Sequence, residues 1–147
     1  MNTKPISILL ADDDIDDCYL FRKALEELPQ TTQLSIVNDG TQLMDLLNDE
    51  TKAFPDVLFL DINMPRKNGI ECLAEIKHNK KLKEVSVVMF STSNSREKID
   101  GLLKTGAHVY IRKPGDFEQL KRTIQHALSM ATDITFPNSQ LKYILNA

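Results

Sequence analysis

Short apolar runs alternate along the chain with longer stretches of mixed polarity. The runs cover residues 6–11, 34–37, 57–60, 85–90 and 109–111, and each has the length of a β-strand. The first, third and fourth are almost uninterrupted rather than alternating between apolar and polar residues. Such continuity is typical of strands in a parallel sheet that is covered by helices on both faces.

Between these runs, apolar residues recur at every third or fourth position, which predicts amphipathic helices. The recurring positions are Ile15, Cys18, Phe21, Leu25 and Leu28, then Leu43, Leu46 and Leu47, then Ile70, Leu73 and Ile76, then Ile99, Leu102 and Leu103, and finally Phe117, Leu120, Ile124 and Leu128. We expect Asp14 to cap the first helix and Gly106 to end the fourth. A strand followed by a helix, five times over, predicts a doubly wound α/β fold with right-handed crossovers.

Polar side chains that could bind a ligand or take part in a reaction follow four of the five runs. They are Asp12, Asp13 and Asp14 after the first run, Asp61 after the third, Ser91 at the end of the fourth and Lys113 after the fifth. In a doubly wound sheet the functional cleft lies beyond the carboxyl ends of the strands, so these groups should converge there. Histidine and cysteine do not follow any of the runs, which argues against a Ser-His-Asp or Cys-His site.

Crowded carboxylates repel one another by roughly 4 kcal/mol at ~4 Å near a protein surface. A hard divalent cation such as Mg²⁺ prefers oxygen ligands and turns this repulsion into attraction, so the pattern predicts a Mg²⁺ site. Asp16 and Asp17 are expected instead to be solvated acids in the first helical turn, favoured there by the helix dipole.

Composition narrows the functional classes. The 147 residues fit one domain, and a net charge of -3 without long basic runs argues against direct binding of nucleic acid. Cys18 and Cys72 lack metal-ligand spacing and are expected to be buried, reduced thiols. The first apolar run is too short for a signal peptide or a membrane span, so we expect a cytoplasmic protein with no membrane contact.

Four motifs together carry a family resemblance. "LLADDD", "LFLDINMPRKNG", "VVMFSTS" and "GAHVYIRKP" occur in this order, each at a predicted strand end. With them the chain resembles a two-component response regulator receiver domain from about residue 5 to about residue 131. The resemblance implies the (βα)5 flavodoxin-like receiver fold with a five-stranded parallel sheet. Residues 1–131 would form the receiver domain, and residues 132–147 a C-terminal tail without an output domain.

The same resemblance implies a role for each conspicuous residue. Asp61 would accept a phosphoryl group, and Mg²⁺ would be bound by Asp61, Asp12, Asp13 and the backbone carbonyl of Asn63. Ser91 and Lys113 would contact the phosphoryl oxygens. Tyr110 would be the switch aromatic that swings inward on phosphorylation. A cis peptide bond between Lys113 and Pro114 is also implied.

The implied function is that of a single-domain response regulator rather than a conventional enzyme. A histidine kinase or phosphotransfer protein would donate the phosphoryl group, and a downstream protein would read the face made by the fourth helix, fifth strand and fifth helix. The phrases "DINMPRKNG" and "KPGDFEQL" resemble regulators that partner phytochrome-type kinases. The apolar tail is a candidate contact with the domain itself or with a second copy in a homodimer.

Three other functions compete with this interpretation. A haloacid-dehalogenase-like phosphatase also ends its first strand in Asp-x-Asp, as Asp12 and Asp14 do, but Asp16 departs from that motif and the chain has no room for a cap domain. An EF-hand is disfavoured, because Asp17 occupies the required glycine position and Lys23 that of the bidentate glutamate. A receiver-like interaction module that takes no phosphate remains the third alternative.

Overall fold

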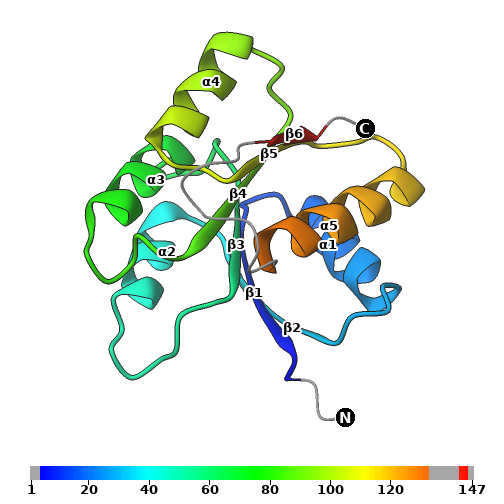
Figure 1. The fold of residues 1–147 in the computed structure, drawn as a ribbon, viewed down its shortest axis with the longest axis horizontal. Coiled ribbons are helices and arrows are strands. Elements are labelled where there is room, and N and C mark those ends of the chain that lie inside the picture. The colour runs from blue at the N-terminus through cyan, green and yellow to red at the C-terminus, as the bar shows by residue number, and fades with distance from the viewer. Residues whose placement is uncertain (1–3, 133–142, 146–147) are drawn as a thin grey trace.

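The structure is a computed structural model that describes residues 4–132 and 143–145. Figure 1 shows one twisted sheet with helices on both faces. The strands are β1 (Ile6–Ala11), β2 (Thr32–Val37), β3 (Val57–Leu60), β4 (Ser86–Ser91), β5 (Val109–Arg112) and β6 (Tyr143–Leu145). The helices are α1 (Ile15–Glu26), α2 (Gly40–Leu47), α3 (Gly69–His78), α4 (Arg96–Thr105) and α5 (Phe117–Thr132).

All neighbouring strands pair in parallel, in the order β2-β1-β3-β4-β5-β6. The predicted α/β class and the five parallel strands with five helices are confirmed. A sixth strand extends the sheet beyond the prediction, because Tyr143–Leu145 pair with β5 in parallel. The rest of the tail, residues 133–142 and 146–147, lies outside the described residues.

The core has two halves, one on each face of the sheet. Helices α1 and α5 cover one face, and α2, α3 and α4 cover the other (Figure 1). Side chains of one strand alternate between them: Ile8 and Leu10 face α1 and α5, whereas Leu9 and Ala11 face the other three helices. Both halves are apolar, which explains why the strand sequences are continuous rather than alternating.

The caps expected at Asp14 and Gly106 are present, and α3 has a further cap at its start. The Asp14 carboxylate accepts a hydrogen bond from the N–H of Asp17 at 3.0 Å and so caps α1. Asn68 and Glu71 form a reciprocal capping box at the start of α3. Gly106 ends α4 with a φ of 131°, a value that favours glycine.

Two helix positions and one peptide bond differ from the predictions. Ile15 and Ile70 continue the apolar spacing but are 80% and 41% exposed, and each lies in the first turn of its helix. The described residues contain no cis peptide bond, so the expectation for Lys113–Pro114 is wrong for this structure. Cys18 and Cys72 are buried free thiols, as expected.

Candidate functional site

Four neighbouring strands bring the predicted site residues to one edge of the sheet. β1, β3, β4 and β5 are adjacent, so the residues that follow them adjoin. Backbone hydrogen bonds continue the sheet by one step: Asp61 N–H donates to the Ala11 carbonyl at 3.0 Å, and Lys113 N–H donates to the Ser91 carbonyl at 2.8 Å. These bonds fix the backbone from which the functional side chains project.

Three carboxylates converge at this edge. Asp12, Asp13 and Asp61 each offer an oxygen atom, and these atoms lie within 4.8 Å of one another. Asp12 is fully buried and Asp61 is 6% exposed, whereas Asp13 reaches the solvent. A set of carboxylate oxygens fits a hard cation such as Mg²⁺ and does not suit a soft metal that prefers thiolates. The donor chemistry therefore agrees with the metal expected from the sequence.

The Lys113 ammonium lies among the acids. Its Nζ is 2.9 Å from Asp12 Oδ2, 2.8 Å from Asp17 Oδ2 and 3.5 Å from Asp61 Oδ2. The same nitrogen lies 5.2 Å from the centre of the Phe90 ring, within cation–π range. Lys113 thus reaches the carboxylate cluster, as the sequence predicted, and balances part of its negative charge.

Asp17 is a site residue that the sequence interpretation missed. It was expected to be a solvated acid, yet it makes the shortest ion pair of Lys113, and its side chain is only 34% exposed. Asp17 precedes the buried Phe21 by four residues, and residues at this spacing share one face of a helix. That spacing was the available signal that Asp17 points inward.

Burial and charge change the proton affinities of the site. Burial raises the pKa of Asp61 to about 6; the Lys113 ammonium opposes this rise, and the Asp12 carboxylate adds to it. For Lys113, burial works to lower the pKa, but the hydrogen bonds to Asp17 and Asp12 and the negative charges of Asp61 and Asp12 together raise it. At neutral pH the site therefore holds a charged lysine and a largely ionised Asp61.

Ser91 and Tyr110 lie together beside the acids. Ser91 is fully buried, and its Oγ lies 3.5 Å from the backbone nitrogen of Ser93, at the limit of a hydrogen bond. Tyr110 is also fully buried, and its hydroxyl donates to the Ser93 carbonyl at 2.7 Å. The ring is therefore already inward in this structure, whereas the sequence interpretation reserved that position for the phosphorylated state.

The loop after β3 is tightly held against the site. The N–H of Gly69 donates to the Ile62 carbonyl at 2.8 Å, and a Cβ at Gly69 would lie 2.1 Å from the Asp61 carbonyl oxygen. Asn63 in this loop is exposed, and a hydrogen bond from its backbone N–H lowers the pKa of Asp61. The role of the Asn63 carbonyl as a metal ligand stays a prediction.

The chain was also compared with known protein families. The family model described as "Response regulator receiver domain" matches residues 8–125. The chain belongs to this family. The resemblance found in the sequence is thereby confirmed, and the phosphatase and EF-hand alternatives are excluded.

Individual relatives match the chain over most of its length. Response regulator Rcp1 of Synechocystis sp. is 31% identical over 125 residues, covering 82% of this chain and 85% of Rcp1. The probable methanogenesis regulatory protein FilR2 of Methanothrix harundinacea is 31% identical over 124 residues, covering 82% of this chain and 80% of FilR2.

Solved structures share the fold. The Mn²⁺-bound form of Rcp1 has a TM-score of 0.80 at 30% identity, covering 90% of this chain and 99% of Rcp1. The phosphorylated cyanobacterial phytochrome response regulator RcpA has a TM-score of 0.80 at 30% identity, covering 91% of this chain and 98% of RcpA.

Family membership settles the coarse function. The protein is a response regulator receiver domain of two-component signalling, a class of signalling proteins rather than classical enzymes. Receiver domains bind Mg²⁺ or Mn²⁺ at an acidic pocket, and Asp12, Asp13 and Asp61 form such a cluster here. Across residues 4–132 and 143–145, none of the helices has the length and apolar character needed to span a bilayer.

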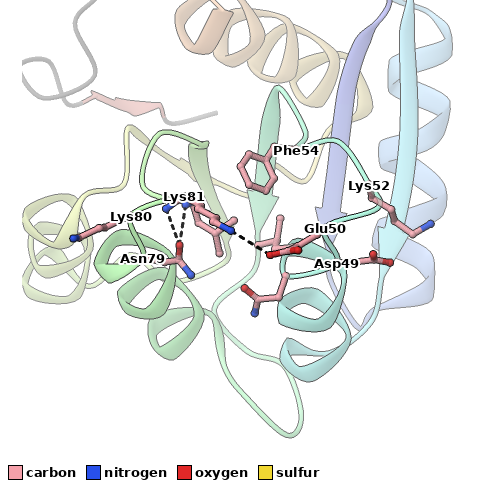
Figure 2. Close-up of a pocket in the computed structure, with 10 residues that line it drawn as sticks. Asp49, Glu50, Lys52, Phe54, Asn79, Lys80 and Lys81 are labelled. Carbon is pink, nitrogen blue, oxygen red and sulfur yellow. Dashed lines mark hydrogen bonds and ion pairs between the residues drawn. The ribbon is translucent and has the colours of Figure 1, made fainter.

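The receiver also has a cavity that is separate from the cluster of Asp12, Asp13 and Asp61. It measures about 650 Å³ and lies at the opposite edge of the sheet, where the chain leaves α2 and α3 (Figure 2). Its lining includes Leu47, Phe54 and Leu82, and an ion pair of 3.2 Å between Lys81 and Glu50 links the two loops beside it. None of the predicted site residues lines it, so the cavity is separate from the cluster of Asp12, Asp13, Asp61 and Lys113.

Proposed function

We propose that Asp61 accepts a phosphoryl group from a histidine kinase or phosphotransfer protein in a Mg²⁺-dependent reaction. The observation that supports this most directly is the position of Asp61, a buried carboxylate that lies close to two further aspartates and to the Lys113 ammonium. Residues 1–131 would act as the receiver domain and residues 132–147 as a tail.

In this reaction an Asp61 oxygen attacks the phosphorus atom, the phosphorus–nitrogen bond of phosphohistidine breaks, and an acyl phosphate forms. Mg²⁺, held by Asp12, Asp13, Asp61 and the Asn63 carbonyl, would neutralise charge on the phosphoryl oxygens. Lys113 would pair with another of these oxygens, and the Ser91 hydroxyl would donate a hydrogen bond. Because its pKa is about 6, Asp61 is mostly ionised at neutral pH and can act as the nucleophile.

An exposed apolar surface beside the acids supports a protein as the donor. Ile15, Tyr19 and Leu20 of α1 are 80%, 58% and 42% exposed, and Ile15 follows the acidic run directly. Exposed apolar side chains grouped at a site are typical of a protein-binding surface. The likeness to RcpA, a phytochrome response regulator, supports a phytochrome-type kinase as the partner. The buried reduced thiols fit the expected cytoplasmic location.

The inward Tyr110 changes how the switch would work. The phosphoryl group would draw the Ser91 hydroxyl toward itself and thereby stabilise a ring position that is already populated. Signalling to a downstream protein through α4, β5 and α5 would then be a shift between existing populations. Light scattering of the full chain with and without beryllofluoride would test for a homodimer, for which the apolar tail is the candidate contact.

Labelling with acetyl phosphate tests the proposal. We expect Mg²⁺-dependent incorporation of one phosphoryl group, its loss with EDTA, and its loss in Asp61→Asn. The matched control is Asp14→Asn, which makes the same change in charge two residues from Asp12 and keeps a good helix cap. Labelling that persists in Asp61→Asn would mean that another residue takes the phosphoryl group, and it would overturn the role of Asp61. A folded wild-type protein that takes no label would favour the interaction module that takes no phosphate.

A further inference from the structure

Lys113 divides its hydrogen bonds unequally among three acids. Its Nζ lies closer to Asp17 and Asp12, at 2.8 and 2.9 Å, than to Asp61, at 3.5 Å. A distance of 3.5 Å is at the limit of a hydrogen bond, whereas the other two are normal for an ammonium and a carboxylate. The lysine is therefore held mainly by acids other than the phosphoacceptor.

The start of α1 leaves the Asp17 carboxylate free for this contact. An acid at the third position of a helix commonly reaches back to the backbone N–H of the capping residue. Here the capping residue is Asp14, and its N–H donates to Asp12 Oδ1 at 3.0 Å instead. Asp17 keeps its backbone bond to the Asp14 side chain, which fixes the helical turn, while its own side chain turns to Lys113.

To bind a new acceptor, the Lys113 ammonium would have to release one of its present carboxylate partners. The Lys113 side chain is 11% exposed, and its three protons already face three carboxylates. Asp12 is fully buried, so without a bound cation the loss of its pair with Lys113 would leave a buried charge uncompensated. Asp17 is 34% exposed and can be solvated when it is released. Asp17 is therefore the acid that Lys113 can leave at the smallest cost.

We propose that Asp17 is a positioning residue that holds Lys113 in the unphosphorylated state and competes with the phosphoryl group for it. The proposal deepens the function proposed above and rests on it. Asp17 would lower the affinity of the site for a phosphoryl group by the energy needed to break its ion pair with Lys113. It would thus favour return to the unphosphorylated state without touching the phosphoryl group itself.

The test measures affinity for beryllofluoride, an acyl phosphate mimic, by calorimetry at saturating Mg²⁺. We expect Asp17→Asn to bind it about two- to fivefold more tightly, as the loss of one partly exposed ion pair implies. Asp16→Asn is the matched control, because Asp16 is an exposed acid in the same helical turn and should change the affinity less than about twofold. Asp17→Glu retains the charge and should return the affinity toward that of the wild type.

Each outcome separates this inference from the broader proposal. Equal affinities in Asp17→Asn and Asp16→Asn, or weaker binding in Asp17→Asn, would overturn the competition while leaving phosphorylation of Asp61 intact. A wild-type protein that neither binds beryllofluoride nor takes label from acetyl phosphate would overturn the proposed function first. Urea unfolding of all four proteins verifies that the differences do not come from loss of the fold.

Discussion

Replacing Asp61 with asparagine should make the protein more stable at neutral pH in the absence of metal. Burial raises the Asp61 pKa from its ordinary 3.8 to about 6 in the folded state. The stability that Asp61 contributes as a neutral acid is therefore complete below about pH 4 and is lost as the pH rises through about 6. The two pKa values differ by about two pH units, so at about 1.4 kcal/mol per unit the ionised Asp61 costs the fold at most about 3 kcal/mol.

Asparagine keeps the shape and removes this cost, and Lys113 keeps its pairs with Asp12 and Asp17. Urea unfolding in EDTA should show Asp61→Asn to be more stable than the wild type, by a margin that grows by about 1 to 2 kcal/mol between about pH 5 and pH 8. Mg²⁺ at about ten times its Kd should then stabilise the wild type by about 1.4 kcal/mol and the variant by less. A margin that stays constant with pH, or a variant less stable at pH 8, would refute this account of the site.

Three further tests of the surroundings use urea unfolding. Gly69→Ala should destabilise the protein by about 1 to 3 kcal/mol, because the added Cβ would overlap the Asp61 carbonyl oxygen. Gly101→Ala, at an open position of α4, should instead stabilise the protein by up to about 1 kcal/mol. Equal effects of the two substitutions would contradict the close contact at Gly69. Asn68→Ala should cost about 1 kcal/mol through loss of the capping box, with Asn68→Ser as a control that retains a cap. Tyr110→Phe should cost about 1 kcal/mol by removing the bond to the Ser93 carbonyl, and an unchanged unfolding midpoint would contradict that contact.

The strands could be predicted closely because burial on both faces leaves a continuous apolar sequence. The bounds of β1 and β3 agree with the apolar runs at 6–11 and 57–60. Helical spacing was less reliable at helix starts. Ile15 and Ile70 continue the apolar spacing, but they lie in the first turn of their helices and are exposed. Periodicity gives the direction of a side chain and not its depth in the fold.

The gathering of the acids and Lys113 could be predicted because parallel strands all end at one edge. The contact between Asp17 and Lys113 could not, since it joins residues 96 positions apart and depends on how α1 is placed over the sheet. The inward position of Tyr110 likewise depends on the Ser93 carbonyl, whose location follows from the loop after β4. Sequence patterns identify which groups meet at the site, whereas the choice among partners needs three-dimensional packing.

The sixth strand has a consequence for the outer margin of the sheet. Tyr143–Leu145 pair with β5, and so they occupy backbone donors and acceptors that would otherwise face outward. A chain shortened to residue 131 would leave those groups open beside the buried, apolar Val109 and Ile111. Unpaired strand margins of this kind invite association with other chains. Such a truncated protein should therefore aggregate more readily than the full chain even if its phosphorylation chemistry is unchanged.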